Sequence, residues 1–227
     1  MSQDAILIKK GLTTPRAAAI AGILFSILLI TSLTIIRIVV PADPQDAGNW
    51  LSENWKIISL AQNLVPFAGI AFLWFIGVVR DRLGEYEDRL FATVFLGSGL
   101  LFLASLFISS AIAGGILIIY GSAPALLIDS GMYTFGRTVT YEIMNVYTMK
   151  MAGVFMITTC TLSLRTGILP RWMAFIGLVL AVVLLLSSGY ISWALLLFPL
   201  WVLLISIHIL LVNLGKPKDE TLTAAPR

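Results

Sequence analysis

Apolar residues run along this chain in long continuous stretches. Six stretches reach the length of about 20 apolar residues that a helix needs to cross the roughly 30 Å hydrocarbon core of a bilayer. The predicted helices lie at about residues 17–36, 57–79, 91–120, 143–164, 172–189 and 193–214. A transmembrane β-barrel would alternate apolar and polar residues. The pattern therefore predicts an all-α bundle of six transmembrane helices that forms one domain over about residues 17–214.

Two predicted helices have unusual dimensions. The helix at about 91–120 would be about 45 Å long, so we expect it to tilt, to bend at Gly114 and Gly115, or to project beyond the hydrocarbon. Only residues 190–192 separate the last two helices, which predicts a tight antiparallel hairpin. Residues 1–16 are expected to form a cytoplasmic N-terminal lead, and residues 215–227 a disordered cytoplasmic tail.

Basic residues gather on one side of the predicted bundle. Short loops rich in Lys and Arg stay in the cytoplasm. The opposite side has Arg37, Lys56 and Arg137, and Lys150 falls inside a predicted helix. The basic side has 11 of the 15 Lys and Arg residues, namely Lys9, Lys10, Arg16, Arg80, Arg82, Arg89, Arg165, Arg171, Lys216, Lys218 and Arg227. Both termini are therefore predicted to be cytoplasmic.

Composition supports a membrane environment. Of 227 residues, 59% are apolar or aromatic and 12% are charged, whereas soluble domains have about 45–50% and about 25%. The apolar surplus is expected to contact lipid, so the bilayer is the first predicted partner. A net charge of +3, spread thinly, does not suggest a nucleic-acid surface. A membrane-protein partner and a homo-oligomer both stay open.

Residues for metal or acid–base chemistry are scarce. The chain has one cysteine, Cys160, and one histidine, His208. This excludes an intrachain disulfide and a metal site built from several histidines, so His208 would bind a metal only if a partner chain supplied the other ligands. The sequence has no H-E-x-x-H, P-loop or G-x-S-x-G motif. We therefore predict no catalytic residue, no cofactor and no enzymatic activity.

Polar side chains inside the predicted helices are the candidate ligand-binding residues. Charge within a bilayer is costly and usually faces a partner or a cavity. Lys150 and Asn145 on the fourth predicted helix lie at a depth similar to that of Gln62 and Asn63 on the second, and Glu142 and Arg37 lie near the outer mouth. These six residues predict a polar pocket, open to the outer face, for an anionic or zwitterionic small molecule.

The alternative interpretation of these polar residues is structural. The ammonium group of Lys150 could extend along the helix to the interface, since long basic side chains keep their charge in water. The amides of Asn145, Gln62 and Asn63 could then hold helices together by hydrogen bonds.

Two predicted helix starts share one pattern of residues. It is either the trace of a parallel repeat, as some transporters have, or a generic combination of a proline at the first helical position with an arginine at the cytoplasmic headgroups. The two sets are Pro15, Arg16, Ala19 and Gly22, and Pro170, Arg171, Ala174 and Gly177.

Three segments carry a resemblance to a known family. They are RAAAIAGILF at residues 16–25, GILPRW with the glycine at position 177, and FPLWV at residues 198–202. Together they resemble helices of an uncharacterised family of bacterial polytopic membrane proteins, a domain of unknown function, over about a third of the chain. The resemblance implies a multi-pass, all-helical protein of the bacterial inner membrane, and it implies no catalytic or binding residue.

Taken together, the sequence predicts a non-enzymatic polytopic membrane protein, either an accessory subunit of a complex or a small-ligand binder. A secondary transporter or channel with a polar site in the outer half of the bundle is the alternative. A carrier is expected to have polar residues in both membrane halves so that access can alternate. The inner half offers little beyond His208 and Asn213.

Overall fold

The computed structural model describes residues 15–41, 51–83, 89–129, 131–167, 169–187 and 193–214. Nearly all of these residues are helical, and none of them forms a strand. The prediction of an all-α protein is confirmed. The helices are α2 (Pro15–Val39), α3 (Leu51–Leu83), α4 (Arg89–Ser122), α5 (Pro124–Asp129), α6 (Met132–Glu142), α7 (Met149–Thr166), α8 (Arg171–Leu186) and α9 (Leu197–Leu214), with a π-helical segment η1 (Ile143–Thr148) and a short 3₁₀ turn η2 (Ala194–Leu196).

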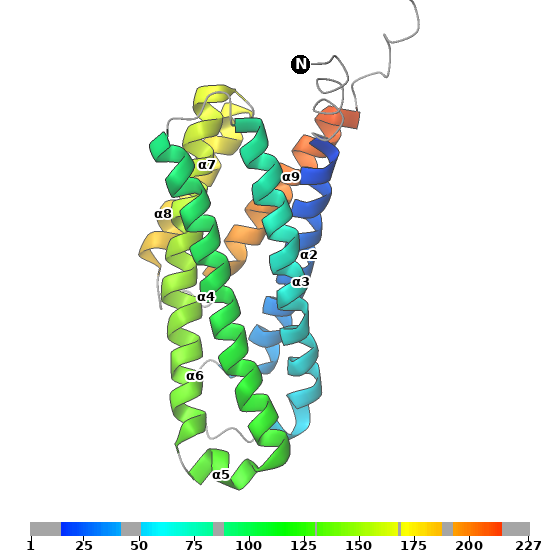
Figure 1. Cartoon of the computed structure of the whole chain (residues 1–227), viewed down its shortest axis with the longest axis vertical. Helices are drawn as coiled ribbons and strands as arrows, with labels where there is room; N and C mark the ends of the chain where they lie inside the picture. The colour runs from blue at the N-terminus through cyan, green and yellow to red at the C-terminus, as the bar shows by residue number, and fades with distance from the viewer. Residues whose placement is uncertain are drawn as a thin grey trace, which may run out of the picture.

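The long helices run side by side along the long axis of the molecule (Figure 1). Helix α2 packs against α3 and α9, and α4 packs against α3 and α7. Segments α6, η1 and α7 follow one another without a break and form one long rod. Helices α8 and α9 lie in the half of the molecule away from α5 (Figure 1). Among the described residues, the end that contains α5 also contains parts of α2, α3, α4 and the α6–η1–α7 rod.

Four helices among the described residues are long and apolar enough to cross a membrane. They are Ala17–Val39, Glu53–Arg80, Leu90–Ser122 and Ala194–Val212, which overlap the first, second, third and sixth predicted helices. The fourth predicted helix lies within the α6–η1–α7 rod, which begins 11 residues earlier, at Met132. The fifth corresponds to α8, which has 16 residues and ends at Leu186.

Helix continuity differs from the sequence expectation in one place. Helix α4 continues through Gly114 and Gly115, in keeping with the single helix expected there, but most of the segment between the third and fourth predicted helices is itself helical, as α5 and α6. Hydropathy identifies the apolar part of a helix, whereas a helix can continue into a polar, amphipathic sequence such as that of α6. The predicted hairpin turn at 190–192, most of the N-terminal lead and the predicted tail lie outside the described residues.

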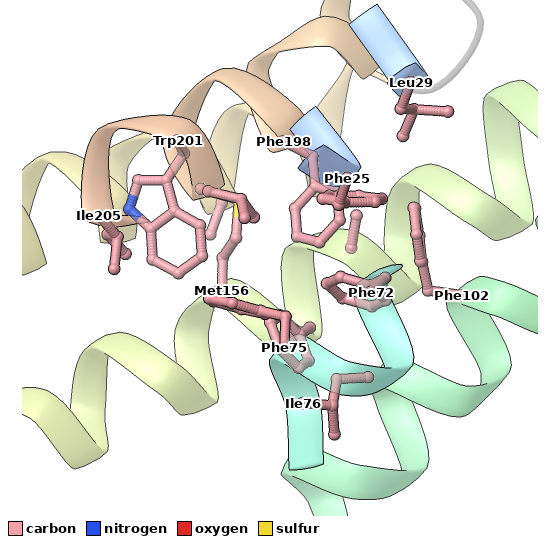
Figure 2. Packing of buried hydrophobic residues seen from close by; sticks show 14 of the residues in the cluster. Phe25, Leu29, Phe72, Phe75, Ile76, Phe102, Met156, Phe198, Trp201 and Ile205 are labelled. Atoms are coloured by element: carbon pink, nitrogen blue, oxygen red, sulfur yellow. The ribbon is translucent and has the colours of Figure 1, made fainter. Parts of the chain in front are cut away.

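Aromatic rings fill the centre of the bundle. Five helices each contribute at least one fully buried phenylalanine, and five of these rings meet there: Phe25 (α2), Phe72 (α3), Phe102 (α4), Phe155 (α7) and Phe198 (α9). The ring centroid of Phe72 lies 4.5 Å from that of Phe25, 5.3 Å from those of Phe102 and Phe155, and 5.6 Å from that of Phe198. Figure 2 shows Phe25, Phe72, Phe102 and Phe198 close together. Tilted and edge-on pairs at such distances add to the stabilisation from burial. This ring cluster connects five helices at one point.

The two helices that share a starting pattern both pack a glycine closely against α9. A Cβ atom added to Gly22 on α2 would overlap the Ser206 side chain, and one added to Gly177 on α8 would overlap the indole of Trp201. Small residues let helix backbones approach each other in membrane proteins. The glycines of the shared pattern therefore have a packing role in the structure, whichever origin the pattern has.

A second hydrophobic cluster lies toward the α5 end of the bundle, separate from the main core. We call it the outer cluster; its buried members come from α3, α4, α5 and α6 and are Leu51, Ile58, Leu117, Leu127 and Tyr133. Between this cluster and the main core, the side chains leave a cavity.

Candidate functional site

The cavity has two adjoining parts. The first, the arginine lobe, has a volume of about 110 Å³ and lies between α2, α3 and the α6–η1 segment. Its lining combines hydrocarbon side chains with two guanidinium groups, two carboxamides and a phenol. The lining residues are Leu33, Ile36, Arg37, Val40, Pro41, Gln62, Arg137, Thr140, Tyr141, Met144 and Asn145.

Arg37 and Asn145 connect α2 to the π-helical segment. The Arg37 Nη2 donates a hydrogen bond of 2.6 Å to the Asn145 Oδ1. Asn145 is 3% exposed, and its Nδ2 donates to the backbone carbonyl of Tyr141 at 2.9 Å. A π-helical turn widens a helix locally and is frequent at functional sites. Here it lies in the segment that places Asn145 against Arg37.

Arg137 brings a second positive charge to the same lobe. It lies on α6, and its Nη2 donates a hydrogen bond of 2.7 Å to the carbonyl of Pro41, just beyond the end of α2. Its Nη1 donates to the hydroxyl of Tyr133 at 3.2 Å. Sequence reasoning placed Arg137 on the outer side but not in the site, because the helix that carries it was not predicted.

The other polar groups of the lobe are neutral. The Gln62 Oε1 accepts a hydrogen bond of 2.6 Å from the Ser110 Oγ on α4. Tyr141 lines the lobe, and its hydroxyl makes no hydrogen bond with the described residues. No Asp or Glu is among the described residues that line the lobe. Within this part of the chain, the lobe therefore has two cationic groups and no acidic side chain.

The second part, the apolar lobe, has a volume of about 100 Å³ and adjoins the first. The two lobes share Ile36, Val40, Gln62, Arg137 and Thr140. The apolar lobe extends from there into the outer cluster. The residues it adds are Leu51, Ile58, Ala113, Ile116, Leu117 and Tyr133, of which only Tyr133 has a polar side-chain atom.

The structure brings together three of the six residues predicted to bind a ligand and separates the other three. Arg37, Asn145 and Gln62 line the arginine lobe. Lys150, Asn63 and Glu142 have exposed side chains and line neither lobe. A role of these three in ligand binding stays a prediction.

Helix geometry explains why the three are separated. The side chain of Lys150 is exposed, whereas Asn145 is 3% exposed, so the two residues lie on different faces of the rod. Asn63 follows Gln62 directly and points about 100° away from it. Asn63 instead lines a shallow groove between α3 and α4, together with Pro66 and Ser110.

The groups that could hold a metal ion are dispersed. No group of three or more His, Cys, Asp or Glu side chains occurs among the residues that the structure describes. Cys160 is buried in α7, and His208 is half-buried in α9. The expectation that a partner chain would have to complete any metal site at His208 stays a prediction.

Comparison of the chain with known protein families, curated proteins and solved structures found no match. The resemblance noted from the sequence therefore stays a prediction. The geometry of the cavity and the apolar character of the helices are the grounds on which a function can be inferred.

Proposed function

We propose that this chain is an integral membrane protein that crosses a bacterial inner membrane six times, with both termini in the cytoplasm, and that it binds an anionic group in the arginine lobe. The observation that carries the proposal is the environment of Arg37. Its guanidinium is half-buried, its one hydrogen bond within the described part of the chain goes to the neutral amide of Asn145, and no described carboxylate lines the cavity.

The distance of the site from the basic end of the bundle supports this placement. A span of 18 to 21 helical residues covers about 27–32 Å, the thickness of the hydrocarbon core. Polar residues of the site lie at that separation from basic residues at the opposite end: Arg37 from Arg16, Gln62 from Arg80, Ser110 from Arg89, and Asn145 from Arg165. With the basic end at the cytoplasmic boundary, the arginine lobe lies at the outer boundary.

Exposed apolar side chains support the assignment of α8 as a span despite its length. Sixteen residues cover about 24 Å, and a short span is accommodated when the bilayer thins locally. Large hydrophobic side chains line its outward face, since Trp172, Phe175, Ile176, Val179, Val182 and Leu186 are all exposed. Such a face is stable in lipid and costly in water.

Electrostatics favours an anion as the occupant. Removing a guanidinium partly from water costs free energy unless an opposite charge or hydrogen-bond acceptors compensate. Arginine presents several N–H donors in one plane, which match the oxygens of a carboxylate or phosphate. Arg137 and Tyr141 line the same lobe. An anion there would accept hydrogen bonds from Arg37 and gain attraction from its charge.

The packing of the inner half supports a binder over a carrier. A carrier needs a path that opens to each side in turn. The ring cluster of Phe25, Phe72, Phe102, Phe155 and Phe198 is fully buried and occupies the centre of the bundle. A role as an accessory subunit is the other half of the expectation from the sequence, and no feature of the cavity favours it over ligand binding.

Thermal unfolding of the purified protein tests the binding proposal. In a neutral maltoside detergent at constant ionic strength, sodium phosphate or acetate replaces sodium chloride. A ligand that binds only the folded state stabilises it by RT ln(1 + [L]/Kd), about 2.7 kcal/mol at 100 times Kd. We expect one of the two anions to raise the apparent Tm of the unmodified protein and to leave that of Arg37→Gln unchanged.

Two further variants give this experiment its controls. Lys56→Gln removes a positive charge from an exposed residue at the same end of the bundle, and we expect it to retain the Tm increase. Lys150→Gln tests the expectation from the sequence, and the geometry predicts retention there too. If neither anion raises the Tm, or if Arg37→Gln retains the full increase, the proposed site is wrong.

Cysteine labelling tests the orientation. In a Cys160→Ala background, the Lys56→Cys variant is expected to react with a membrane-impermeant maleimide in intact cells. Arg165→Cys, at the opposite end, is expected to react only after lysis. Labelling of Arg165→Cys in intact cells would reverse the proposed orientation.

A further inference from the structure

The apolar lobe lies on the side of the arginine lobe that is away from the main core. Relative to Gln62, its α3 residues Ile58 and Leu51 lie toward the start of that helix, and on α4 its residues Ala113 and Leu117 lie beyond Ser110. Both directions lead to the α5 end (Figure 1). With increasing distance from the centre of the bundle, the cavity therefore passes from Arg37, which lines the arginine lobe alone, to Arg137, which lines both lobes, and then to mostly apolar side chains.

Helix α8 ends well before this level. Leu185, in its last turn, lies beside Gly153 of α7, and Asn145 is eight residues further along the rod, or about 12 Å. In the proposed orientation, the arginine lobe lies at the outer boundary of the hydrocarbon. The apolar lobe then lies in the part of the bundle that projects beyond it.

An apolar cavity at that position has a chemical consequence. Beyond the shared residues, the described part of its lining has one polar side-chain atom, the Tyr133 hydroxyl, which accepts a hydrogen bond from Arg137. Water gains few hydrogen bonds in such a space, and an alkyl chain gains contact with hydrocarbon and is removed from water. The cavity thus has Arg37 at one end, Arg137 between the two lobes, and a region suited to hydrocarbon at the other end.

We infer that the ligand is an anionic amphiphile with a single alkyl chain. Its carboxylate or phosphate binds at Arg37 in the arginine lobe, and its chain enters the apolar lobe, directed away from the bilayer. This inference rests on the proposed function and adds the class of ligand. The protein would thereby hold the hydrocarbon part of the molecule above the membrane surface, inside the outer cluster.

A series of chain lengths tests the inference. Carbon-14-labelled n-alkyl carboxylates from acetate to octanoate are dialysed against the protein in phosphatidylcholine nanodiscs, and partition into empty nanodiscs is subtracted. Burial of a methylene group contributes about 0.8 kcal/mol, which is about fourfold in affinity. We expect affinity to rise by up to this factor per methylene until the lobe is filled. The n-alkylammonium ions of equal length are expected not to bind.

Matched variants separate the contribution of the apolar lobe to binding from that of the arginines. Ala113→Leu adds hydrocarbon to the apolar lobe without changing a charge, and Ile116→Phe is a second blocking variant in case the first fails to fold. Ala111→Leu, on the exposed face of the same helix, is the control. We expect the rise with chain length to persist in Ala111→Leu and to disappear in a folded blocking variant, while acetate binds equally to both.

The outcomes distinguish the inference from the proposed function. If acetate and octanoate bind with equal affinity, or if both blocking variants keep the rise with chain length, the amphiphile is excluded and the anion site remains. If no carboxylate binds and phosphate does not stabilise the protein, the anion site itself is excluded. Dioctanoyl phosphatidic acid is expected to bind no more tightly than octyl phosphate. If it binds tenfold more tightly, the inference that the ligand has a single alkyl chain is wrong.

Discussion

The contact between α2 and α9 gives a sharp prediction for packing. A Cβ atom added to Gly22 would overlap the Ser206 Oγ and lie 2.8 Å from the Phe75 Cδ2. Ser206 can rotate its hydroxyl away, but Phe75 is 1% exposed and stacks on Phe72 with ring centroids 6.0 Å apart. The Gly22→Ala variant therefore has to move a ring of the core, or separate α2 from α9.

The size of the destabilisation by Gly22→Ala follows from a comparison with a second glycine. Overpacking of a core typically costs about 1–3 kcal/mol, and replacing a helical glycine by alanine contributes about 1 kcal/mol of helix propensity. Gly97 on α4 has nothing within 4 Å of an added Cβ. Because both variants share the propensity gain, the difference between Gly22→Ala and Gly97→Ala is the overpacking cost. This cost corresponds to about 2–12 °C in Tm for a chain of this size.

The assay is thermal unfolding in detergent at one fixed scan rate, since membrane proteins often unfold irreversibly. The Ser206 hydroxyl is buried and has no hydrogen-bond partner among the described residues, so we expect Ser206→Ala to leave the Tm unchanged or to raise it. In the Gly22→Ala/Ser206→Ala double variant, the overlap with Ser206 is removed and the overlap with Phe75 remains. We therefore expect this variant to recover part of the Tm that Gly22→Ala loses. Equal Tm values for Gly22→Ala and Gly97→Ala would refute the close approach of α2 and α9.

Three further variants test the interior in the same assay. Phe72→Ala removes the ring that contacts four helices and is expected to cost about 3–5 kcal/mol, visible as a fall in Tm that Phe72→Leu shows only in part. Trp201→Phe removes an indole N–H that is buried without a partner among the described residues, so we expect a much smaller fall in Tm than for Trp201→Ala. Equal falls in Tm would show that the N–H contributes to stability. Ser32→Ala removes the 2.8 Å hydrogen bond to the Ala61 carbonyl between α2 and α3 and is expected to cost about 0.6–2 kcal/mol, and an unchanged Tm would contradict that contribution.

The difference between the predicted and the observed site has a simple physical basis. Depth along a helix follows from residue number, so the sequence placed Gln62 and Asn145 at a similar depth and Arg37 near the outer mouth, and all three line the arginine lobe. The direction of a side chain around the helix axis depends on how each helix is rotated in the bundle. Lys150 has its charge at a similar depth, yet its side chain is exposed and lines neither lobe.

Arg137 shows the opposite case. Its segment has few apolar residues, so hydropathy gave no reason to expect a helix there, and α6 lies in what read as a connection between two spans. The structure brings Arg137 to the end of α2, where it donates to the Pro41 carbonyl. The amphipathic pattern of residues 132–142 was the signal that could have identified this helix.

By itself, the sequence determined the class of the fold, because burial of apolar surface and hydrogen bonding of the backbone in lipid both depend on composition counted along the chain. It also determined the depth of the polar residues along their helices. The distribution of basic residues between the two ends predicted the orientation to be tested. Only the tertiary structure decided which of these residues meet. The cavity exists where side chains from α2, α3, α4 and α6 leave space between the main core and the outer cluster, and that space depends on how separate helices pack rather than on any one segment.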